Sequence, residues 1–135
     1  MENQTVQPTI TEVGKIWGRD AIYLDRVNMI NESTFEISGS FNGSLCENLN
    51  SGDFKSFDIS FNAVHLFKMI ELDFDETEYQ SAFDEVLHSE QINHLIALDQ
   101  ARSIGKIDTS YRHFVFRTYD TVFEIICKGF ELKMT

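Results

Sequence analysis

The chain has 135 residues and a formal net charge of −11, which comes from 22 acidic and 11 basic side chains. This length is typical of one domain with one core, and twelve Phe residues predict that the core is aromatic. The negative balance argues against nucleic acid and anionic membranes as partners, since both are bound through Lys and Arg. The first ten residues lack the basic and apolar regions of a signal peptide, and nowhere do about 18 apolar residues run together, so we expect a cytoplasmic protein.

The N-terminal segment, residues 1–11, is polar and contains the one Pro of the chain. We therefore expect a disordered or frayed terminus, followed by a single globular domain over 12–135. β-branched and aromatic residues favour a strand over 21–29, and residues 31–33 are a turn signal. Apolar and polar residues then alternate over 34–41, which predicts a second strand paired with the first in a hairpin. The turn-rich segment 45–53 is expected to be a loop.

Residues 54–74 form the longest run dense in strand-forming residues, and we expect the fold to be organised around it. Its first half alternates, with Phe57, Ile59 and Phe61 on one face, as in a half-buried strand. Between Ala63 and Met69 this alternation of apolar and polar residues breaks, and both faces carry apolar side chains. Either a bulge divides one long strand, or the chain turns near residues 62–65 and forms two strands. Helical spacing in the second half leaves a helix as a further interpretation.

A helix is predicted over 89–103, after a mixed segment, 75–89, whose beginning has a helical composition. Ser89 can accept hydrogen bonds from the free amides of the first turn, and Glu90 lies near the positive end of the helix dipole. Gly105 supplies a stop signal beyond the last turn. The apolar side of this helix is expected to consist of Ile92, Leu95, Ile96 and Leu98.

The C-terminal third predicts strands again, over 113–118 and 122–134, with a turn at Asp120 and a bulge at Gly129, where the apolar face switches. Short connections favour antiparallel pairing. The predicted fold class is α+β, mostly an antiparallel β-sheet of about five to seven strands, with one main helix near 89–103.

The acidic residues are concentrated, because no Lys or Arg occurs between Lys68 and Arg102. We expect about half of these acids to be neutralised by the basic residues that follow, such as Arg112 and Arg117, and the rest to present an acidic patch to a basic partner. The candidate patch residues are Glu71, Asp73, Asp75, Glu76, Glu78, Asp84, Glu85 and Glu90.

No pattern predicts a metal site, a cofactor or a catalytic residue. The spacing Asp73-x-Asp75-Glu76-x-Glu78 offers oxygen ligands, but the Gly and the terminal Glu of a helix–loop–helix calcium site are missing. His65, His88, His94 and His113 form no zinc motif, and nothing in the sequence ties a Ser to a His and an acid. Cys46 and Cys127 are isolated, so we expect both to be packing residues. The expectation is a protein without enzymatic activity.

Three segments, FDISFNAVHLFKMIELDF, SAFDEVLHSEQI and HFVFRTYDTVFEIICKGFEL, resemble those of a group of small acidic bacterial proteins, some of which are similar to immunity proteins of polymorphic toxin systems. The resemblance covers residues 21–132. It implies a fold without catalysis that binds and blocks a cognate toxin, often a basic nuclease, through an acidic surface. It carries no site residue over to this chain.

Three hypotheses about function follow. The first is a non-enzymatic acidic binding module, of the immunity type, whose partner is a basic protein such as a toxin. The second is a small-ligand-binding or enzymatic domain with an aromatic pocket around Trp17, Tyr23, His65 and His113. The third is a structural protein that forms homo-oligomers through an exposed strand edge. The sequence does not determine the oligomeric state.

Overall fold

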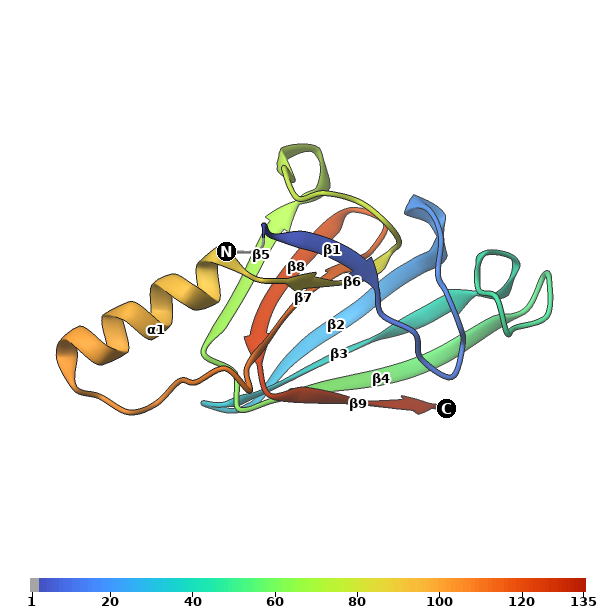
Figure 1. Cartoon of the computed structure of the whole chain (residues 1–135). Coiled ribbons are helices and arrows are strands. Elements are labelled where there is room, and N and C mark those ends of the chain that lie inside the picture. The colour runs from blue at the N-terminus through green and yellow to red at the C-terminus, as the bar shows by residue number, and fades with distance from the viewer. Residues whose placement is uncertain (1–2) are drawn as a thin grey trace.

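The computed structural model describes residues 3–135, in which two antiparallel sheets pack face to face and one α-helix extends from one end (Figure 1). Within these residues the strands are β1 (Thr5–Pro8), β2 (Ile22–Asn31), β3 (Thr34–Asn42), β4 (Phe54–Asn62), β5 (Leu66–Glu71), β6 (Phe83–Leu87), β7 (Arg112–Arg117), β8 (Thr121–Cys127) and β9 (Gly129–Met134). The helix is α1 (Glu90–Arg102), and short 3₁₀ turns occupy Arg19–Ala21, Gly43–Leu45 and Leu72–Phe74. The sheets have the strand orders β1-β6-β7-β8-β5 and β2-β3-β4-β9.

The predicted fold class is confirmed, but the described residues form nine strands instead of five to seven. One additional strand, β1, lies in the segment expected to be frayed, where Val6 pairs opposite Val86 of β6. The expected boundary at residue 12 is therefore wrong for residues 5–8, which belong to the sheet, while residues 1–2 of that segment lie outside the described part. The other additional strand, β6, lies in the mixed segment 75–89, where Asp84 and Glu85 interrupt the apolar pattern that would have predicted a strand.

The stretch 54–74 is two strands in two different sheets, which confirms the second interpretation of the break in its alternation. Its first half is β4, in which Phe57, Ile59 and Phe61 are buried as predicted. The chain then crosses to the other sheet through a turn in which Ala63 has a φ of 51°. The second half, β5, pairs with β8 and so contributes to the five-stranded sheet.

A second crossing between the sheets replaces the bulge predicted at Gly129, which is a correction. β8 pairs with β7 in the five-stranded sheet, whereas β9 begins at Gly129 and pairs with β4 in the other. The two crossings meet, because the backbone N–H of Lys128 donates to the carbonyl of Asn62 over 3.1 Å. The switch of the apolar face in the sequence therefore marks a change of sheet.

The core lies between the sheets and is aromatic, as predicted. Its fully buried aromatic side chains are Phe41, Phe57, Phe61, Phe83, Phe114, Phe116 and Phe123. The Phe61 ring, on β4, has its centroid 6.1 Å from that of Phe114 and 6.4 Å from that of Phe116, both on β7. Burying one such side chain stabilises the fold by about 1.5–3 kcal/mol, so these rings hold the two sheets together.

The hairpin and the helix follow the sequence closely. β2 pairs antiparallel with β3, and the Oγ of Ser89 caps α1 by accepting from the N–H of Ile92 over 3.1 Å. The helix ends at Arg102, one residue before its predicted end, because Ser103 adopts the left-handed conformation with a φ of 53°. Asp99 then holds the segment that leads from α1 back to the sheet, because its carboxylate accepts from the backbone N–H groups of Lys106 and Ile107.

Candidate functional site

Arg117, on the outer face of the five-stranded sheet, holds the loop between β5 and β6. Its Nη1 donates to the carbonyl of Ser81 over 2.7 Å, and its Nη2 donates to the Oγ1 of Thr77 over 3.0 Å and the carbonyl of Glu78 over 2.7 Å. We call residues 71–80 the acidic loop; it projects at the top of Figure 1. Because the guanidinium binds this loop from beneath at several points, the loop is a fixed part of the surface.

Three of the eight candidate patch residues are internal anchors or ion-pair partners, which corrects the predicted patch. Asp84 is fully buried and binds Arg117 Nη1 over 2.6 Å, and the side chain of Asp75 is only 10% exposed with its Oδ2 3.6 Å from Arg117 Nε. Glu85 pairs with Arg112 through two contacts, of 2.7 and 3.0 Å. These pairs are the neutralisation across the fold that the sequence led us to expect.

The remaining patch residues are exposed, and four of them lie on the acidic loop. The Glu71 carboxylate accepts from the backbone N–H of Asp73 over 2.7 Å and shapes the 3₁₀ turn. The carboxylates of Glu76 and Glu78 make no hydrogen bond or ion pair within residues 3–135. Glu90 lies apart, in the first turn of α1. The free negative charge of the patch is thus concentrated on the acidic loop.

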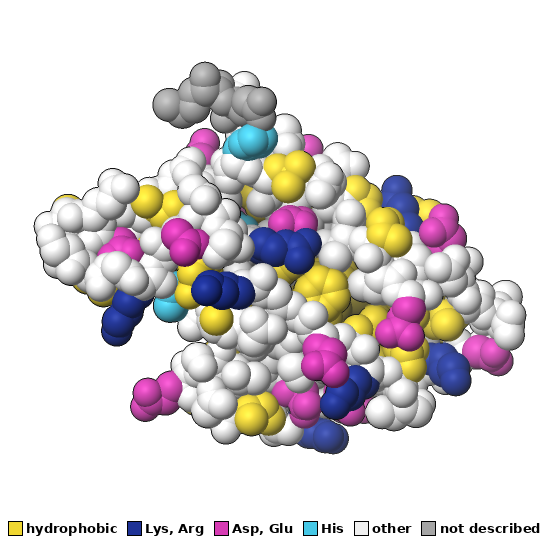
Figure 2. All heavy atoms as spheres, turned by 60° about the horizontal axis from the view of Figure 1, so that its bottom comes forward, with side chains coloured by type: hydrophobic (Ala, Val, Ile, Leu, Met, Phe, Trp, Pro, Cys, Tyr) yellow, Lys and Arg dark blue, Asp and Glu magenta, His cyan; other side chains and the backbone are white. Residues whose placement is uncertain are grey.

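Charge is distributed differently on the lower side of the molecule. Figure 2 brings that side forward and shows Lys and Arg interspersed with Asp and Glu. On β9, for example, the Nζ of Lys133 lies 3.8 Å from the Oε1 of Glu131. A mixed surface of this kind has no strong field of one sign.

Exposed aromatic residues adjoin the acidic loop, and no pattern in the sequence predicted this grouping. On the loop itself, Phe74 is 72% and Tyr79 is 49% exposed. The Tyr79 hydroxyl accepts from the N–H of Gly18 over 2.6 Å, which brings exposed Trp17 to the same end of the molecule. The isolated aromatics of turns gave no periodic signal that could have revealed this grouping.

The aromatic surface continues along this end of the sheets. Arg19 pairs with Asp120 over 3.1 Å and lies 4.5 Å over the ring of Tyr119. Tyr119 stacks on Tyr23 at 5.6 Å, and Tyr23 contacts exposed Phe54 at 6.0 Å. We call Trp17, Tyr23, Phe54, Tyr79 and Tyr119 the aromatic edge.

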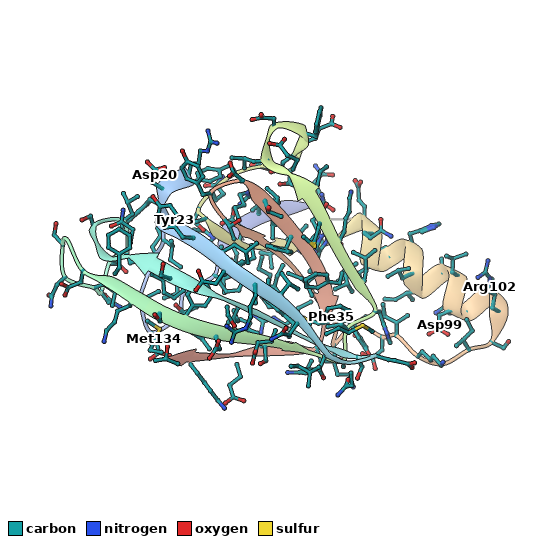
Figure 3. All side chains as sticks on the ribbon, turned by 180° about the vertical axis from the view of Figure 1, so that it is seen from behind. Asp20, Tyr23, Phe35, Asp99, Arg102 and Met134 are labelled. Carbon is teal, nitrogen blue, oxygen red and sulfur yellow. The ribbon has the colours of Figure 1, made fainter. Side chains whose placement is uncertain are left out.

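The aromatic pocket proposed around Trp17, Tyr23, His65 and His113 does not form. Tyr23 lies at the opposite end of the molecule from α1 (Figure 3), whereas His65 stacks on Tyr111 at 4.6 Å and contacts the carbonyl of Lys106, in the segment that returns from α1. His113 lies on the outer face of the five-stranded sheet, within β7.

A surface hollow of about 400 Å³ lies beside the acidic loop. Phe74, Glu76 and Glu78 of the loop form one wall, and His113 and Glu124 form part of the other. Its remaining walls include Gln4, Val6, Lys68, Ile70 and Val86. The free acids of the loop therefore border a concave surface.

A serine, a histidine and an acid are joined in series, contrary to the expectation from sequence. The Oγ of Ser89 lies 2.8 Å from the Nδ1 of His113, and the Nε2 of His113 lies 3.0 Å from the Oε1 of Glu124. The hydrogen bond from His113 is the largest of the effects that lower the pKa of Glu124. No motif could reveal this series, because its members come from the start of α1, from β7 and from β8.

Other chemistry has little support in residues 3–135. No group of three or more His, Cys, Asp or Glu residues there is arranged to hold a metal ion, and no helix there has the length and apolar character needed to cross a membrane. Cys46 and Cys127 are buried, and burial raises the pKa of their thiols to about 11 and about 12. Both therefore stay protonated at neutral pH, as packing residues do.

Comparisons with models of known protein families, with curated proteins and with solved structures found no match for this chain. The resemblance to immunity proteins of polymorphic toxin systems therefore stays a prediction.

Proposed function

We propose that the protein is a binding module, and that the acidic loop and the aromatic edge together dock on a basic protein partner. The observation that carries this proposal is the contrast within the loop. Buried Arg117 binds the Thr77 hydroxyl and the Glu78 carbonyl, while the carboxylates of Glu76 and Glu78 remain exposed without an ion pair in the described residues. A surface that is already ordered loses little conformational entropy when it binds.

The composition of the surface favours a protein partner. Aromatic side chains and Arg are enriched among the residues that contribute most to protein interfaces, and this end of the molecule presents Trp17, Tyr79 and Tyr119 beside Arg19. The acids of the loop add a local negative field, which speeds the approach of a positively charged surface and excludes negatively charged ones. Charge complementarity therefore selects a basic partner.

The resemblance to immunity proteins of polymorphic toxin systems supports a more specific role, in which binding blocks a toxin with a basic surface. In that role the protein would occlude its partner, and the acidic loop would cover the positive surface with which a nuclease holds its own substrate.

The test is a pull-down from a lysate of the source organism with three forms of the protein. The first is the wild type, and the second carries Glu76→Lys and Glu78→Lys. The third, a matched control, carries Asp25→Lys and Glu32→Lys, which make the same change in charge at exposed positions of β2 and its turn. We expect the wild type and the control to retain a basic protein at low salt and to release it at high salt.

The loop variant should not retain that protein, although its thermal unfolding should match that of the wild type, because the changed side chains are exposed. Mass spectrometry identifies the protein, and its association rate with each form can then be measured. Equal retention by the loop variant and the wild type would show that the acidic loop is not the docking surface.

A further inference from the structure

We infer that Ser89 is a nucleophile for the hydrolysis of small carboxylic esters, activated by His113 and Glu124. This inference does not depend on the proposed docking surface, although His113 and Glu124 line the hollow that borders the acidic loop. A positive result would overturn the sequence-based expectation of a protein without catalysis.

The order of the three groups is the one that activates a serine. Glu124 accepts from Nε2–H of His113 over 3.0 Å, and its lowered pKa keeps it ionised at neutral pH. This hydrogen bond selects the tautomer in which Nδ1 carries a lone pair, and that lone pair faces the Ser89 hydroxyl 2.8 Å away. His113 is thus placed as a general base, and Glu124 orients it.

The backbone presents the serine at a strand-to-helix turn. β6 ends at Leu87, His88 takes a left-handed conformation with a φ of 53°, and Ser89 then begins α1. This left-handed residue makes the turn sharp, as Ala63 and Ser103 do at the other turns of residues 3–135 that have a non-glycine residue in this conformation. A serine between a strand and a helix is also found in the hydrolase nucleophile elbow, although here Ser89 itself has an extended backbone, with a φ of −61°, and is only 5% exposed.

The capping role of Ser89 is compatible with attack on a carbonyl. A hydroxyl has one proton and two lone pairs. The N–H of Ile92 uses one lone pair, over 3.1 Å, and the proton is directed to His113, so the second lone pair remains.

The first turn of α1 already binds a carbonyl oxygen. The N–H of Glu90, the residue after the proposed nucleophile, donates to the side-chain Oε1 of Gln4 over 2.8 Å. This N–H, at the positive end of the helix dipole, is the candidate donor to the carbonyl oxygen of a substrate, and the Gln4 side chain that occupies it lines the hollow beside the acidic loop together with His113 and Glu124. Displacing the Gln4 side chain would free this donor.

A substrate has room beside Ser89. A hollow of about 330 Å³ has Ser89 in its wall, together with the apolar side chains Ile92, Ile96 and Tyr111 and the polar side chains Asn93 and Arg112. The wall also includes the polar side chains Glu85, His88 and Thr109, so the lining is mixed, and the size suits a short acyl group.

The reaction needs only water as a second reactant. The Ser89 Oγ attacks the carbonyl carbon while His113 takes the hydroxyl proton and passes it to the alkoxide oxygen that leaves as an alcohol. Water then attacks the acyl-serine ester, His113 takes a proton from it, and the proton returns to Oγ as the carboxylic acid departs. One ester and one water thus give one acid and one alcohol.

The experiment uses the full chain, a fluorophosphonate probe and 4-nitrophenyl acetate. We expect one covalent adduct by intact mass, mapped to Ser89 by peptide sequencing, and hydrolysis above background. Ser89→Asp retains a capping oxygen but removes the nucleophile, and His113→Gln removes the base; each should lower the hydrolysis rate at least tenfold. His94→Gln, on an exposed position of α1, controls for simple hydrolysis by surface histidines and should leave the rate unchanged. Gln4→Ala should raise the rate.

Absence of an adduct on Ser89 in the folded wild type would overturn the inference. So would a folded Ser89→Asp variant that hydrolyses the ester as fast as the wild type. The labelling experiment needs no variant, so it decides the question even where a substitution prevents folding.

Discussion

Arg117 binds Asp84 over 2.6 Å in the interior, where the Arg117 side chain is 5% exposed and the Asp84 side chain is not exposed at all. The pair joins β7 to β6, and the Nη2 of the same guanidinium holds the acidic loop at Thr77 and Glu78. A charge that is removed from water in this way must keep its partner, because an unpaired buried charge is strongly destabilising.

Replacing Arg117 with Met should therefore lower the free energy of unfolding by about 3–5 kcal/mol, since Asp84 would be left as a buried, unpaired carboxylate. Arg19→Met is the matched control, because the Arg19 and Asp120 side chains are 52% and 69% exposed, and it should cost much less stability than Arg117→Met. Urea unfolding at neutral pH measures both. Similar losses for the two variants would show that the buried pair has no special role.

Glu124 should make the fold sensitive to acid. Its pKa is lowered, first of all by the hydrogen bond from His113, so below its ordinary value of 4.5 the unfolded chain binds more protons than the folded one. The stabilising contribution of Glu124 is therefore complete above pH 4.5 and is lost as the pH falls through the folded pKa. In urea unfolding from pH 6 to pH 3, Glu124→Gln should show a shallower loss of stability than the wild type.

The control for this prediction is Glu131→Gln, whose side chain is 70% exposed on β9. It should change the free energy of unfolding by less than about 0.5 kcal/mol across the same range. If Glu124→Gln lost stability toward acid as steeply as the wild type, the hydrogen bond from His113 would not be a source of the acid sensitivity.

Gly39 should tolerate no side chain, because β2 approaches it closely. A Cβ at this position would lie 1.9 Å from the carbonyl oxygen of Tyr23. Gly39→Ala should therefore cost about 3 kcal/mol or more and disturb the pairing of β2 with β3. Gly129→Ala is the comparison, since the nearest atom to its Cβ is the Nδ2 of Asn62 at 3.9 Å, and it should cost less than about 1 kcal/mol. Thermal unfolding and amide hydrogen exchange in β2 measure the two effects.

Cys46 and Cys127 should be inert in the folded protein. Burial raises the pKa of their thiols to about 11 and about 12, and the thiolate is the reactive form. At pH 8, Ellman's reagent should react with neither thiol of the native protein within minutes. It should react rapidly with both thiols of the protein unfolded in 6 M guanidinium. Rapid reaction of one thiol in the native protein would show that it is accessible and ionised.

Local patterns in the sequence determined the elements that depend on neighbouring residues. The alternation of Phe57, Ile59 and Phe61 identified β4 and its buried face, and Ser89 identified the start of α1. These signals work because strand period and helix capping are properties of a few consecutive residues. β1 and β6 carry no such local signal, because their short segments acquire a strand conformation from pairing with each other and with β7.

Only the tertiary structure decided which sheet each strand joins and which acids remain free. The break in the alternation after Asn62 and the face switch at Gly129 were visible in the sequence, but a bulge and a change of sheet produce the same pattern. Nothing in the sequence distinguished Asp84 from Glu78, yet Asp84 is buried against Arg117 and Glu78 is exposed. The series from Ser89 through His113 to Glu124 was equally hidden. Such pairings join residues that are far apart in the chain, and their free energy exists only after the sheets have brought the partners together.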